Sequence, residues 1–553
     1  MSQAQSTAFR VRKAPELGGP GTAQSVYPVA IIGAGPIGLA AAIDLAQRGV
    51  ASVVLDDNNV VSVGSRAICW AKRSLEVFER LGIGQRMLAK GVTWQVGRVF
   101  HGEHQVYEFN LLPEAGHQFP AFINLQQYYV EQYLVERCND FPDLIDLRFK
   151  NQVTHHENKQ DVVRVTVDTP DGPYQLDASY LLACDGARSP TRERMGLSFE
   201  GESFEEQFLI ADVKMDEDPF DAPTPERWFW FEPPFHTGQS ALLHKQPDNV
   251  YRIDLQLGPD ADAEKERDEA SVISRIKSIV GNKPFELEWV SVYKFRCARL
   301  RRFVHDRVIF VGDSAHLVSP FGARGGNGGV HDVDNLCWKL AAIMTRQATP
   351  ALLDSYERER GFGADENIRN SARATNFMTP KSPMERLFRD EVLGLAHHYP
   401  FARRLINSGR LSVPCALVGA QQPGLQTTGM VEIGVIAPDL PLLGEGGQVW
   451  LSTLLGGEFK AVSVDVADHL DLDLLDHVRI FSSASESGSR ALDFVCLDGH
   501  AAARYGAGFT YLVRPDGYVF AGFAGLPDAN AVRAAIEATH MASVQAAGEE
   551  TLA

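Results

Sequence analysis

Three glycines at the spacing G-x-G-x-x-G stand near the start of the sequence: Gly33, Gly35 and Gly38. They follow an apolar run over residues 26–32 and precede a helical periodicity over residues 36–48, which ends at Gly49. This places them at a turn between a strand and a helix. Glycine permits the tight turn and lets backbone N–H groups approach a pyrophosphate, whose charge the helix N-terminus stabilises. The pattern predicts a dinucleotide site; the alternative is a purely structural glycine turn.

An acidic residue is expected at the end of the next strand, where it can bind the ribose hydroxyls of a dinucleotide. Asp56 follows the apolar run over residues 51–55, and Asp57 is a possible substitute. Strand, glycine turn, helix, strand and acid therefore occur in the order of a dinucleotide-binding unit. These residues alone do not separate FAD from NAD.

Two later motifs favour FAD. One is the run CDGARSPTR over residues 184–192, which follows a predicted strand, and the other is GDSAH over residues 312–316, followed by Pro320 and by GARGGNGG over residues 322–329. A carboxylate at the end of a strand can bind a ribityl hydroxyl. A glycine-rich turn that enters a helix can offer backbone N–H groups to the flavin N1–C2=O edge, which is anionic in reduced flavin.

In order and spacing, the three motifs resemble those of the single-component FAD-dependent aromatic hydroxylases, the family of p-hydroxybenzoate hydroxylase and phenol hydroxylase. The resemblance covers about residues 26–420, and the whole chain is most similar to the 3-(3-hydroxyphenyl)propionate and 3-hydroxyphenylacetate hydroxylase group. It implies bound FAD, transient NADH or NADPH, and a set of cofactor-binding residues: Gly33, Gly35, Pro36, Gly38, Asp56, Asp57, Arg66, Gln127, Asp185, Gly186, Gly312, Asp313, Gly326 and Asn327.

Within that set the resemblance implies particular roles. Arg66 and Gln127 contact the flavin, Asp313 binds the ribityl chain, and the backbone of Gly326 and Asn327 faces the flavin pyrimidine. The Asp185-Gly186 pair serves both FAD and NAD(P)H. Pro320 lies beside the reaction centre.

The resemblance also implies the reaction. Reduced FAD and O₂ form a C4a-hydroperoxide, whose distal hydroxyl is transferred to a ring carbon ortho or para to a phenol hydroxyl, while the protein excludes water and helps to deprotonate the phenol. Relatives often carry His or Asp two residues after the arginine matched by Arg66, but here that position is Ile68. The phenol base is therefore unassigned. His236, His244 and Tyr293 are candidates that could equally be ordinary sheet residues, and His316 could be structural or lie near the flavin.

A substrate carboxylate would need a cationic partner. Alternation over residues 251–257 puts Arg252, Asp254 and Gln256 on one face of a strand, so Arg252 is a candidate clamp if that face lines the pocket. The alternative is a solvated outer face with an Arg–Asp pair. Arg324, in the glycine-rich loop, is a second cation near the flavin.

The aromatic run WFWFEP over residues 228–233 is similar to the W-x-W-x-I-P signature of flavin halogenases, with Glu232 at the Ile position. Alternating aromatics suit a strand in the core or a pocket wall equally well. We expect the run to line the core or the pocket and not to mark a halogenase.

The predicted fold is α/β: a Rossmann-like FAD-binding domain of the p-hydroxybenzoate hydroxylase type, an inserted antiparallel-sheet substrate domain and a C-terminal thioredoxin-like domain. The predicted boundaries are a flexible tail (1–25), the discontinuous FAD-binding domain (26–200 and 296–375), the substrate domain (201–295), a helical segment and linker (376–425) and the thioredoxin-like domain (430–545). The last lacks C-x-x-C, so we expect it to serve structure or dimer formation and the protein to be a homodimer.

The formal net charge of −18 argues against nucleic-acid and anionic-membrane partners. The seven scattered cysteines predict reduced thiols in a cytoplasmic protein and no zinc site. Neither an apolar signal region nor an 18-residue apolar stretch occurs.

The resulting hypothesis is NAD(P)H-dependent hydroxylation of a phenol with an acidic side chain. The alternatives are a polyketide-type or chlorinated phenol as substrate, an FAD dehydrogenase or halogenase, and a non-catalytic nucleotide-binding protein.

Overall fold

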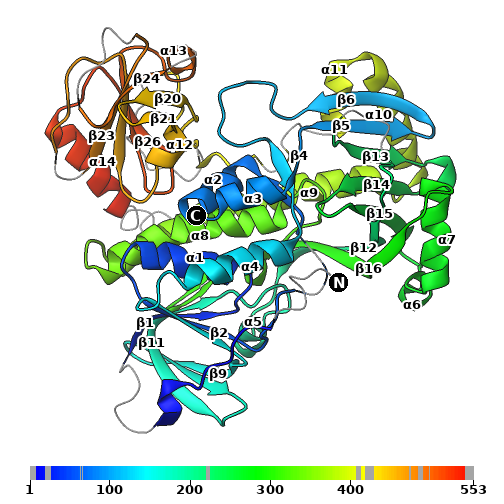
Figure 1. Ribbon diagram of the computed structural model, residues 1–553, viewed down its shortest axis with the longest axis horizontal. Helices are drawn as coiled ribbons and strands as arrows, with labels where there is room; N and C mark the ends of the chain where they lie inside the picture. Colours follow the sequence, from blue (N-terminus) through cyan, green and yellow to red (C-terminus); the bar gives the residue numbers. More distant parts are fainter. Residues whose placement is uncertain are drawn as a thin grey trace, which may run out of the picture.

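The computed structural model describes residues 8–18, 26–62, 64, 67–219, 224–406, 411, 413–417, 429–472, 475–483, 490–496 and 499–541. Three bodies are visible in Figure 1: a sheet with helices at lower left, a second sheet at right and a smaller α/β module at upper left. No helix in these ranges is long and apolar enough to cross a membrane.

The first body is built on a largely parallel sheet. Its strand order is β17 (Val304–His305), β18 (Val308–Phe310), β11 (Tyr174–Ala183), β1 (Tyr27–Ile32), β2 (Ser52–Asp56) and β8 (Ile145–Phe149). In addition, β10 (Val163–Asp168) pairs with β11, and β9 (Gln152–Asn158) pairs with β10. Helices α1 (Pro36–Gln47), α4 (Gln127–Cys138) and α8 (Gly325–Met344) pack on it and on one another. The predicted strands over residues 174–176 and 180–183 form the single strand β11, because it pairs with β10 on one side and β1 on the other.

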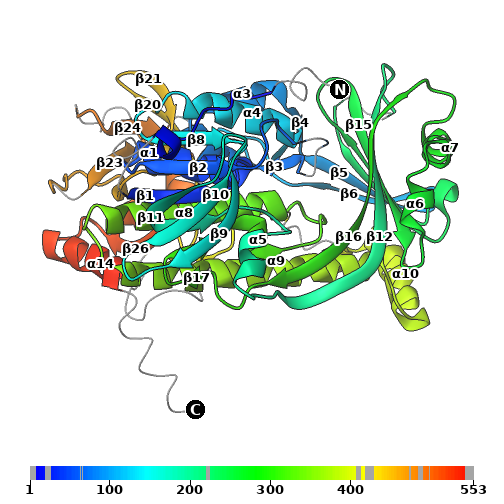
Figure 2. The same ribbon diagram turned by 90° about the horizontal axis from the view of Figure 1, so that it is seen from below.

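The second body is an eight-stranded sheet. Its order is β19 (His316–Leu317), β16 (Glu286–Arg299), β12 (Glu200–Lys214), β15 (Val250–Gly258), β14 (Ser240–Lys245), β13 (Arg227–Phe231), β5 (Val96–His101) and β6 (His104–Asn110). The long strands β12 and β16 run from the first body into this sheet (Figure 2). β5 and β6 come from outside the predicted substrate domain, and pairing with them satisfies the backbone groups along the edge of β13.

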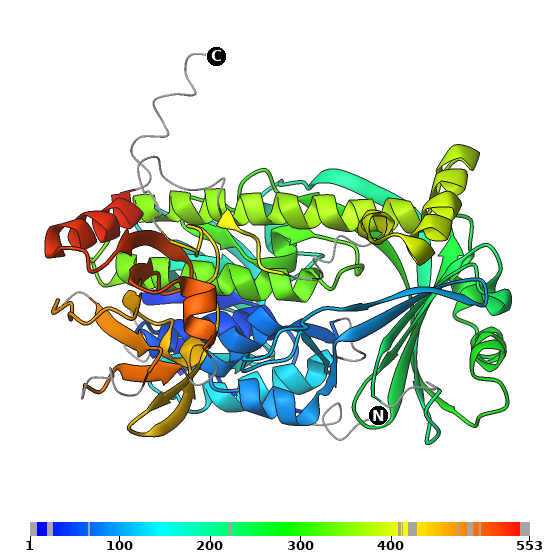
Figure 3. The same cartoon turned by 90° about the horizontal axis from the view of Figure 1, so that it is seen from above.

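The two faces of the second sheet are covered differently. Helix α7 (Glu269–Val280) packs on the outer face, where it buries the aliphatic side chains of Leu209, Leu243 and Ile253. The inner face turns toward the first body and toward α9 (Leu353–Met378), a long helix that spans the molecule in Figure 3. Helices α10 (Pro383–His398) and α11 (Pro400–Ile406) follow it, and Pro383 begins α10 behind the capping residue Ser382.

The C-terminal module has a seven-stranded sheet. Its order is β21 (Gly447–Trp450), β20 (Pro441–Gly444), β24 (Asp493–Cys496), β23 (Asp476–Phe481), β22 (Lys460–Val464), β25 (Phe509–Val513) and β26 (Val519–Ala524). The β23–β22 pair is parallel, and β25 and β26 add antiparallel neighbours. With α13 (His500–Tyr505) before β25 and α14 (Ala529–Met541) after β26, this is the expected thioredoxin-like arrangement.

Residues 8–18, which fall within the segment expected to be a flexible tail, make specific contacts with the first body. Phe9 stacks on Phe149 at 4.9 Å between ring centroids, and its backbone N–H donates to the carbonyl of Asn59. Glu16 forms an ion pair at 2.8 Å with Arg148, whose side chain is 1% exposed. A buried guanidinium needs a carboxylate partner, and this need fixes the segment on the first body.

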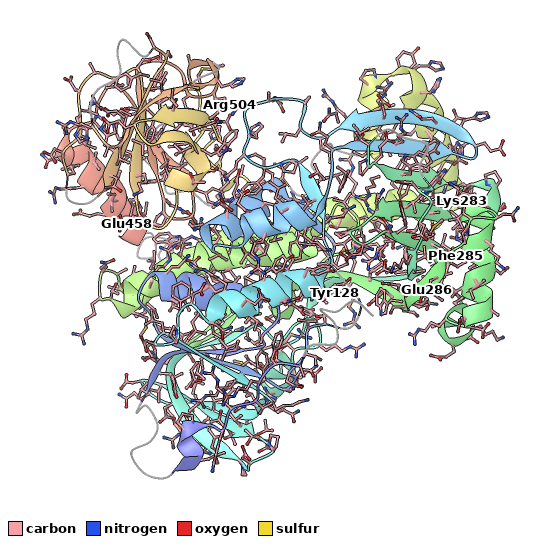
Figure 4. All side chains as sticks on the ribbon, viewed as in Figure 1. Tyr128, Lys283, Phe285, Glu286, Glu458 and Arg504 are labelled. Carbon is pink, nitrogen blue, oxygen red and sulfur yellow. The ribbon has the colours of Figure 1, made fainter. Side chains whose placement is uncertain are left out.

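Ionic contacts join the C-terminal module to the first body. Arg514 of the module donates to Glu359 of α9 at 2.7 and 3.0 Å, and Lys339 of α8 donates to the same carboxylate at 2.8 Å. At the other side of the interface, Arg504 donates to the carbonyls of Ala115 and Gly116 (Figure 4). The module is thus attached through buried charges.

We expect Glu359→Gln to lower the free energy of unfolding by about 3 kcal/mol at pH 7, because Lys339 and Arg514 would lose the carboxylate that they share. Burial alone would raise the pKa of Glu359, but Arg514 and Lys339 outweigh it and hold the pKa well below its usual value. A depressed pKa adds stability above the unfolded value of about 4.3, and this contribution is lost as the pH falls below it.

Urea unfolding at several pH values measures this loss of stability. The difference in free energy of unfolding between the wild type and Glu359→Gln should narrow below about pH 4.3. The matched control is Glu458→Gln. Glu458 is 78% exposed and lies 3.9 Å from Lys460, so its loss should cost less than about 0.5 kcal/mol (Figure 4). Equal effects of the two substitutions would contradict the assignment.

Candidate active site

The turn between β1 and α1 has the shape that a pyrophosphate requires. Gly33 has φ +104°, and a Cβ there would lie 2.6 Å from the carbonyl oxygen of Cys184. Gly35 is the N-cap of α1, and a Cβ on it would meet no protein atom within 4 Å. The helix N-terminus therefore opens onto space beside Gly35, as expected for bound phosphate.

Asp56 ends β2 and closes this turn. Its Oδ2 accepts from the backbone N–H of Ala34 at 2.6 Å, and its Oδ1 accepts from that of Asn58 at 2.8 Å. Burial raises the pKa of Asp56, and these two hydrogen bonds counter the rise. A carboxylate has about four acceptor sites, so capacity remains for ribose hydroxyls. Asp57 is exposed beside it.

The second motif follows β11 directly. Asp185 Oδ2 accepts from the N–H of Thr191 at 3.0 Å, and its Oδ1 is buried with no hydrogen-bond partner among the described residues. Gly186 has φ +77° and open space at its Cβ position. An orphaned carboxylate oxygen beside an open glycine fits a cofactor with hydroxyl or N–H donors.

The third motif is held by a buried ionic cluster. Asp332 Oδ2 accepts from the backbone N–H of Gly312 at 3.0 Å and pairs with His316 Nε2 at 2.6 Å, while Arg360 donates to Oδ1 at 2.6 Å. Burial would raise the pKa of Asp332, but His316 and Arg360 lower it to about 2. His316 therefore supports the loop, whereas the side chain of Asp313 is exposed.

The glycine-rich loop lies against the segment after β2. Asn327 Nδ2 donates to the carbonyl of Cys69 at 2.9 Å, and Asn327 Oδ1 accepts from the N–H of Ala71 at 3.0 Å. Gln127 Oε1 accepts from the N–H of Ala67 at 3.2 Å, and a Cβ on Gly326 would lie 3.3 Å from Ala67. The structure thus brings these predicted flavin contacts together.

Two further predicted site residues are Arg66 and Pro320. Arg66 lies outside the described residues. Pro320 is exposed at the start of the loop that leads to Phe321 and Arg324.

A cavity that is partly open to solvent adjoins this loop on the inner face of the second sheet. Side chains of β5, β6, β13, the glycine-rich loop and α9 form most of its wall. The lining residues are Arg98, Val99, Tyr107, Phe109, Arg227, Phe229, Phe231, Phe321, Gly322, Arg324, Asn370, Arg373, Ala374, Phe377, Met378, Ile406 and Leu411. Apolar and aromatic groups dominate, with a few cations, as is typical of a site for an aromatic ligand.

Arg227, like Arg98 and Arg373, is a cation in this wall that the sequence analysis missed. It begins β13, and its guanidinium lies 5.9 Å from the centroid of the Trp94 ring. No hydrogen bond or ion pair joins it to another described residue, whereas Arg98 is paired with Glu226. Burial lowers the pKa of Arg227, although Cys69 and Asp254 act in the opposite direction, so an anion in the cavity would stabilise the buried charge further. The sequence feature that could have identified Arg227 is its position two residues before Phe229, which puts both side chains on the same face of the strand.

The aromatic run divides between the two faces of β13. Phe229 and Phe231 line the cavity, and Trp228 and Trp230 pack against the outer cluster beneath α7. Glu232, at the position where the halogenase signature has Ile, forms an ion pair with Arg389 at 2.5 Å. The run therefore serves as pocket wall and core.

Two residues predicted to be catalytic are not in the cavity wall. Arg252 is buried on the inner face, and it binds Asp212 through two hydrogen bonds of 2.9 and 2.8 Å. The predicted alternative of a solvated outer face does not hold either, because the face is covered by the first body. His236 lies beyond β13, and its Nε2 is 2.5 Å from the carbonyl of Gln256.

Comparisons with known proteins agree with this geometry. Residues 26–371 match the model of a protein family described as the FAD binding domain. The chain is 29% identical over 387 residues to the 3-(3-hydroxy-phenyl)propionate/3-hydroxycinnamic acid hydroxylase of Mycolicibacterium gilvum, covering 70% of this chain and 66% of that protein.

It is also 29% identical over 512 residues to the 12-dehydrotetracycline 5-monooxygenase/anhydrotetracycline 6-monooxygenase of Streptomyces rimosus, covering 89% of this chain and 94% of that one. Among solved structures, the complex of aklavinone-11 hydroxylase with FAD and aklavinone superposes with a TM-score of 0.73 at 19% identity, over 94% of this chain and 99% of that one. At that identity the likeness concerns the fold.

Proposed function

The chain belongs to the FAD binding domain family and is an FAD-dependent monooxygenase, and we propose that it hydroxylates a phenol with an acidic side chain, a 3-hydroxyphenylalkanoate. The observation that carries the proposal is the cavity beside the glycine-rich loop, in which Arg227 makes no hydrogen bond or ion pair with any described residue. When bound, FAD reduced by NAD(P)H activates O₂ and supplies the hydroxyl oxygen.

The side chains of the cavity would orient such a substrate. Phe229, Phe231 and Phe321 offer faces and edges to the ring and exclude water from it. Arg227, on the sheet side, would stabilise negative charge on the phenol oxygen. The exposed Arg373, on the α9 side, would bind the carboxylate, because an ion costs less to hold where it stays partly hydrated.

A polyketide-type phenol is the second candidate. The cavity is partly open, so it sets no upper limit on the size of the ring system, and the tetracycline monooxygenase aligns over most of both chains. The apolar walls suit a larger ring system equally well, so the choice between the two classes requires a substrate panel.

The purified protein is expected to release FAD on denaturation, and a 3-hydroxyphenylalkanoate should accelerate NAD(P)H oxidation and yield a product one oxygen atom heavier. Polyketide-type phenols and neutral phenols complete the panel. Faster turnover of the polyketides would favour the second candidate. If no phenol accelerated NAD(P)H oxidation, aromatic hydroxylation itself would be ruled out.

A further inference from the structure

Besides Asp212, the inner face of the second sheet carries another carboxylate, that of Asp254, which is close to Arg227. Leu242 of β14 pairs with Asp254 of β15 on one side and with Phe229 of β13 on the other. The three side chains therefore lie on the same face of the sheet. Phe229 lines the cavity. Asp254 therefore lies on the same sheet face as the cavity wall, two strands away from β13 and beside the lining residues rather than among them.

The hydrogen bonding of Asp254 differs from that of its neighbour Asp212. Both oxygens of Asp212 are held by Arg252, and Gln246 donates to one of them at 3.0 Å. Asp254 accepts no hydrogen bond from any described residue: its Oδ1 is buried and unpartnered, and its Oδ2 lies 3.9 Å from His244 Nε2. Its side chain is 15% exposed. A buried carboxylate without protein donors is open to a donor from water or from a bound ligand.

The surroundings place this carboxylate beside the predicted flavin contacts. Asp254 and Arg227 both act electrostatically on the thiol of Cys69, the residue whose carbonyl accepts from Asn327. Cys69 directly follows Ile68, the position at which the expected base is absent. A sheet residue thus supplies a carboxylate close to the point where the loop lacks one.

From this juxtaposition, and on the basis of the proposed function, we propose that Asp254 is the general base that takes the proton of the phenol hydroxyl while Arg227 stabilises the phenolate. The O–H bond breaks, its electron pair stays on the phenol oxygen, and the proton goes to a carboxylate oxygen of Asp254. The proton returns to solvent after the product leaves, so the step requires no further reactant.

The charged groups around Asp254 suit this task. Arg227 faces it from β13, His244 from β14, Arg252 from its own strand, Asp212 from β12 and the Cys69 thiol from β3 (Cys69–Ala71). Burial raises the pKa of Asp254 to about 6, although Arg252 and Arg227 oppose the rise. Burial and the two arginines lower the pKa of His244 well below its ordinary value, so its ring is neutral. Asp254 is consequently ionised and able to accept a proton near neutral pH.

The test is Asp254→Asn, which keeps the size of the side chain but removes the base. We expect kcat/KM for a 3-hydroxyphenylalkanoate to fall by about 10²–10⁴-fold at pH 7, with FAD content unchanged. In the wild type, kcat/KM should rise with pH through an apparent pKa near 6; in the variant it should instead climb toward the pKa of the free phenol, about 10. Nitro-substituted phenols, which ionise without help, should restore most of the loss.

A binding measurement separates this role from a structural one. A nitrophenol titrated into the oxidised holoenzyme below the nitrophenol's own pKa should show the phenolate absorption band with the wild type and the phenol band with Asp254→Asn. Asp212→Asn is the structural control, because it removes the partner of Arg252; it should reduce turnover of nitro-substituted and ordinary phenols by the same factor.

If phenols stimulate the wild type and Asp254→Asn keeps its pH profile and the phenolate band, the assignment of Asp254 is wrong and the proposed function stands. If no phenol accelerates NAD(P)H oxidation by the wild type and none binds as phenolate, both the proposed function and the assignment of Asp254 as the base are wrong.

Discussion

Arg227→Ala is expected to lower kcat/KM for a phenolic acid by about 10²–10³-fold, equivalent to a loss of about 3–4 kcal/mol in transition-state stabilisation. The reason is that Arg227 is the cavity arginine that the described residues leave without a hydrogen bond or ion pair, in a wall whose other residues are mostly apolar. Negative charge that develops on the phenol oxygen would then face an apolar surface. Steady-state NAD(P)H oxidation, together with product quantification, measures the loss and any uncoupled turnover.

Two further variants define the effect. Arg227→Lys should recover part of the activity, since an ammonium retains the charge but not the planar donor geometry. Arg275→Ala is the matched control: Arg275 lies on α7, which covers the opposite face of the same sheet, and pairs with Glu266 at 2.5 Å. It should change kcat/KM by less than about threefold, as expected for a surface pair. Similar losses in the two alanine variants would show that Arg227 acts only through the stability of the sheet.

Gly33→Ala is expected to destabilise the protein even without cofactor, by at least about 2 kcal/mol, and to abolish FAD retention. The added Cβ would lie 2.6 Å from the carbonyl oxygen of Cys184, and the φ of +104° disfavours any side chain. Neither feature can be relieved without separating β1 from β11, because Cys184 belongs to the backbone that follows β11. Thermal unfolding of the apoprotein and FAD fluorescence titration measure the two effects.

Gly35→Ala provides the contrast. A Cβ at Gly35 meets no protein atom within 4 Å, and its φ of −74° is compatible with alanine. The apoprotein should therefore keep its stability within about 1 kcal/mol, the usual effect at a helix N-cap. FAD affinity should nevertheless fall at least about tenfold, since the methyl group would occupy the path of the pyrophosphate. Wild-type FAD affinity in Gly35→Ala would mean that the phosphates do not approach this turn.

The cofactor site was largely predictable from sequence because its parts are local. A turn that requires Gly33, a helix that begins after Gly35 and an acid at the end of β2 all follow from consecutive residues and backbone geometry. The loops that hold Asp185 and Asp313 are likewise short segments after strands, and parallel strands bring their ends to one edge of the sheet.

The residues of the substrate cavity could not be predicted from sequence in the same way. Alternation correctly placed Arg252, Asp254 and Gln256 on one face of β15, but period-two spacing cannot tell which face meets the rest of the molecule. That depends on α7 covering one face, on β5 and β6 joining the sheet from a distant part of the chain, and on the first body covering the other face. As a result, Arg252 pairs with Asp212, and Arg227 lies in the cavity wall.

The sequence by itself determined the cofactor, its family of folds and the turns that bind it, because each depends on neighbouring residues. The tertiary structure alone decided which cation faces the cavity and which carboxylate was left without a donor. Those properties arise from the packing of strands that are far apart in the chain, where burial and pairing are set by every neighbour at once.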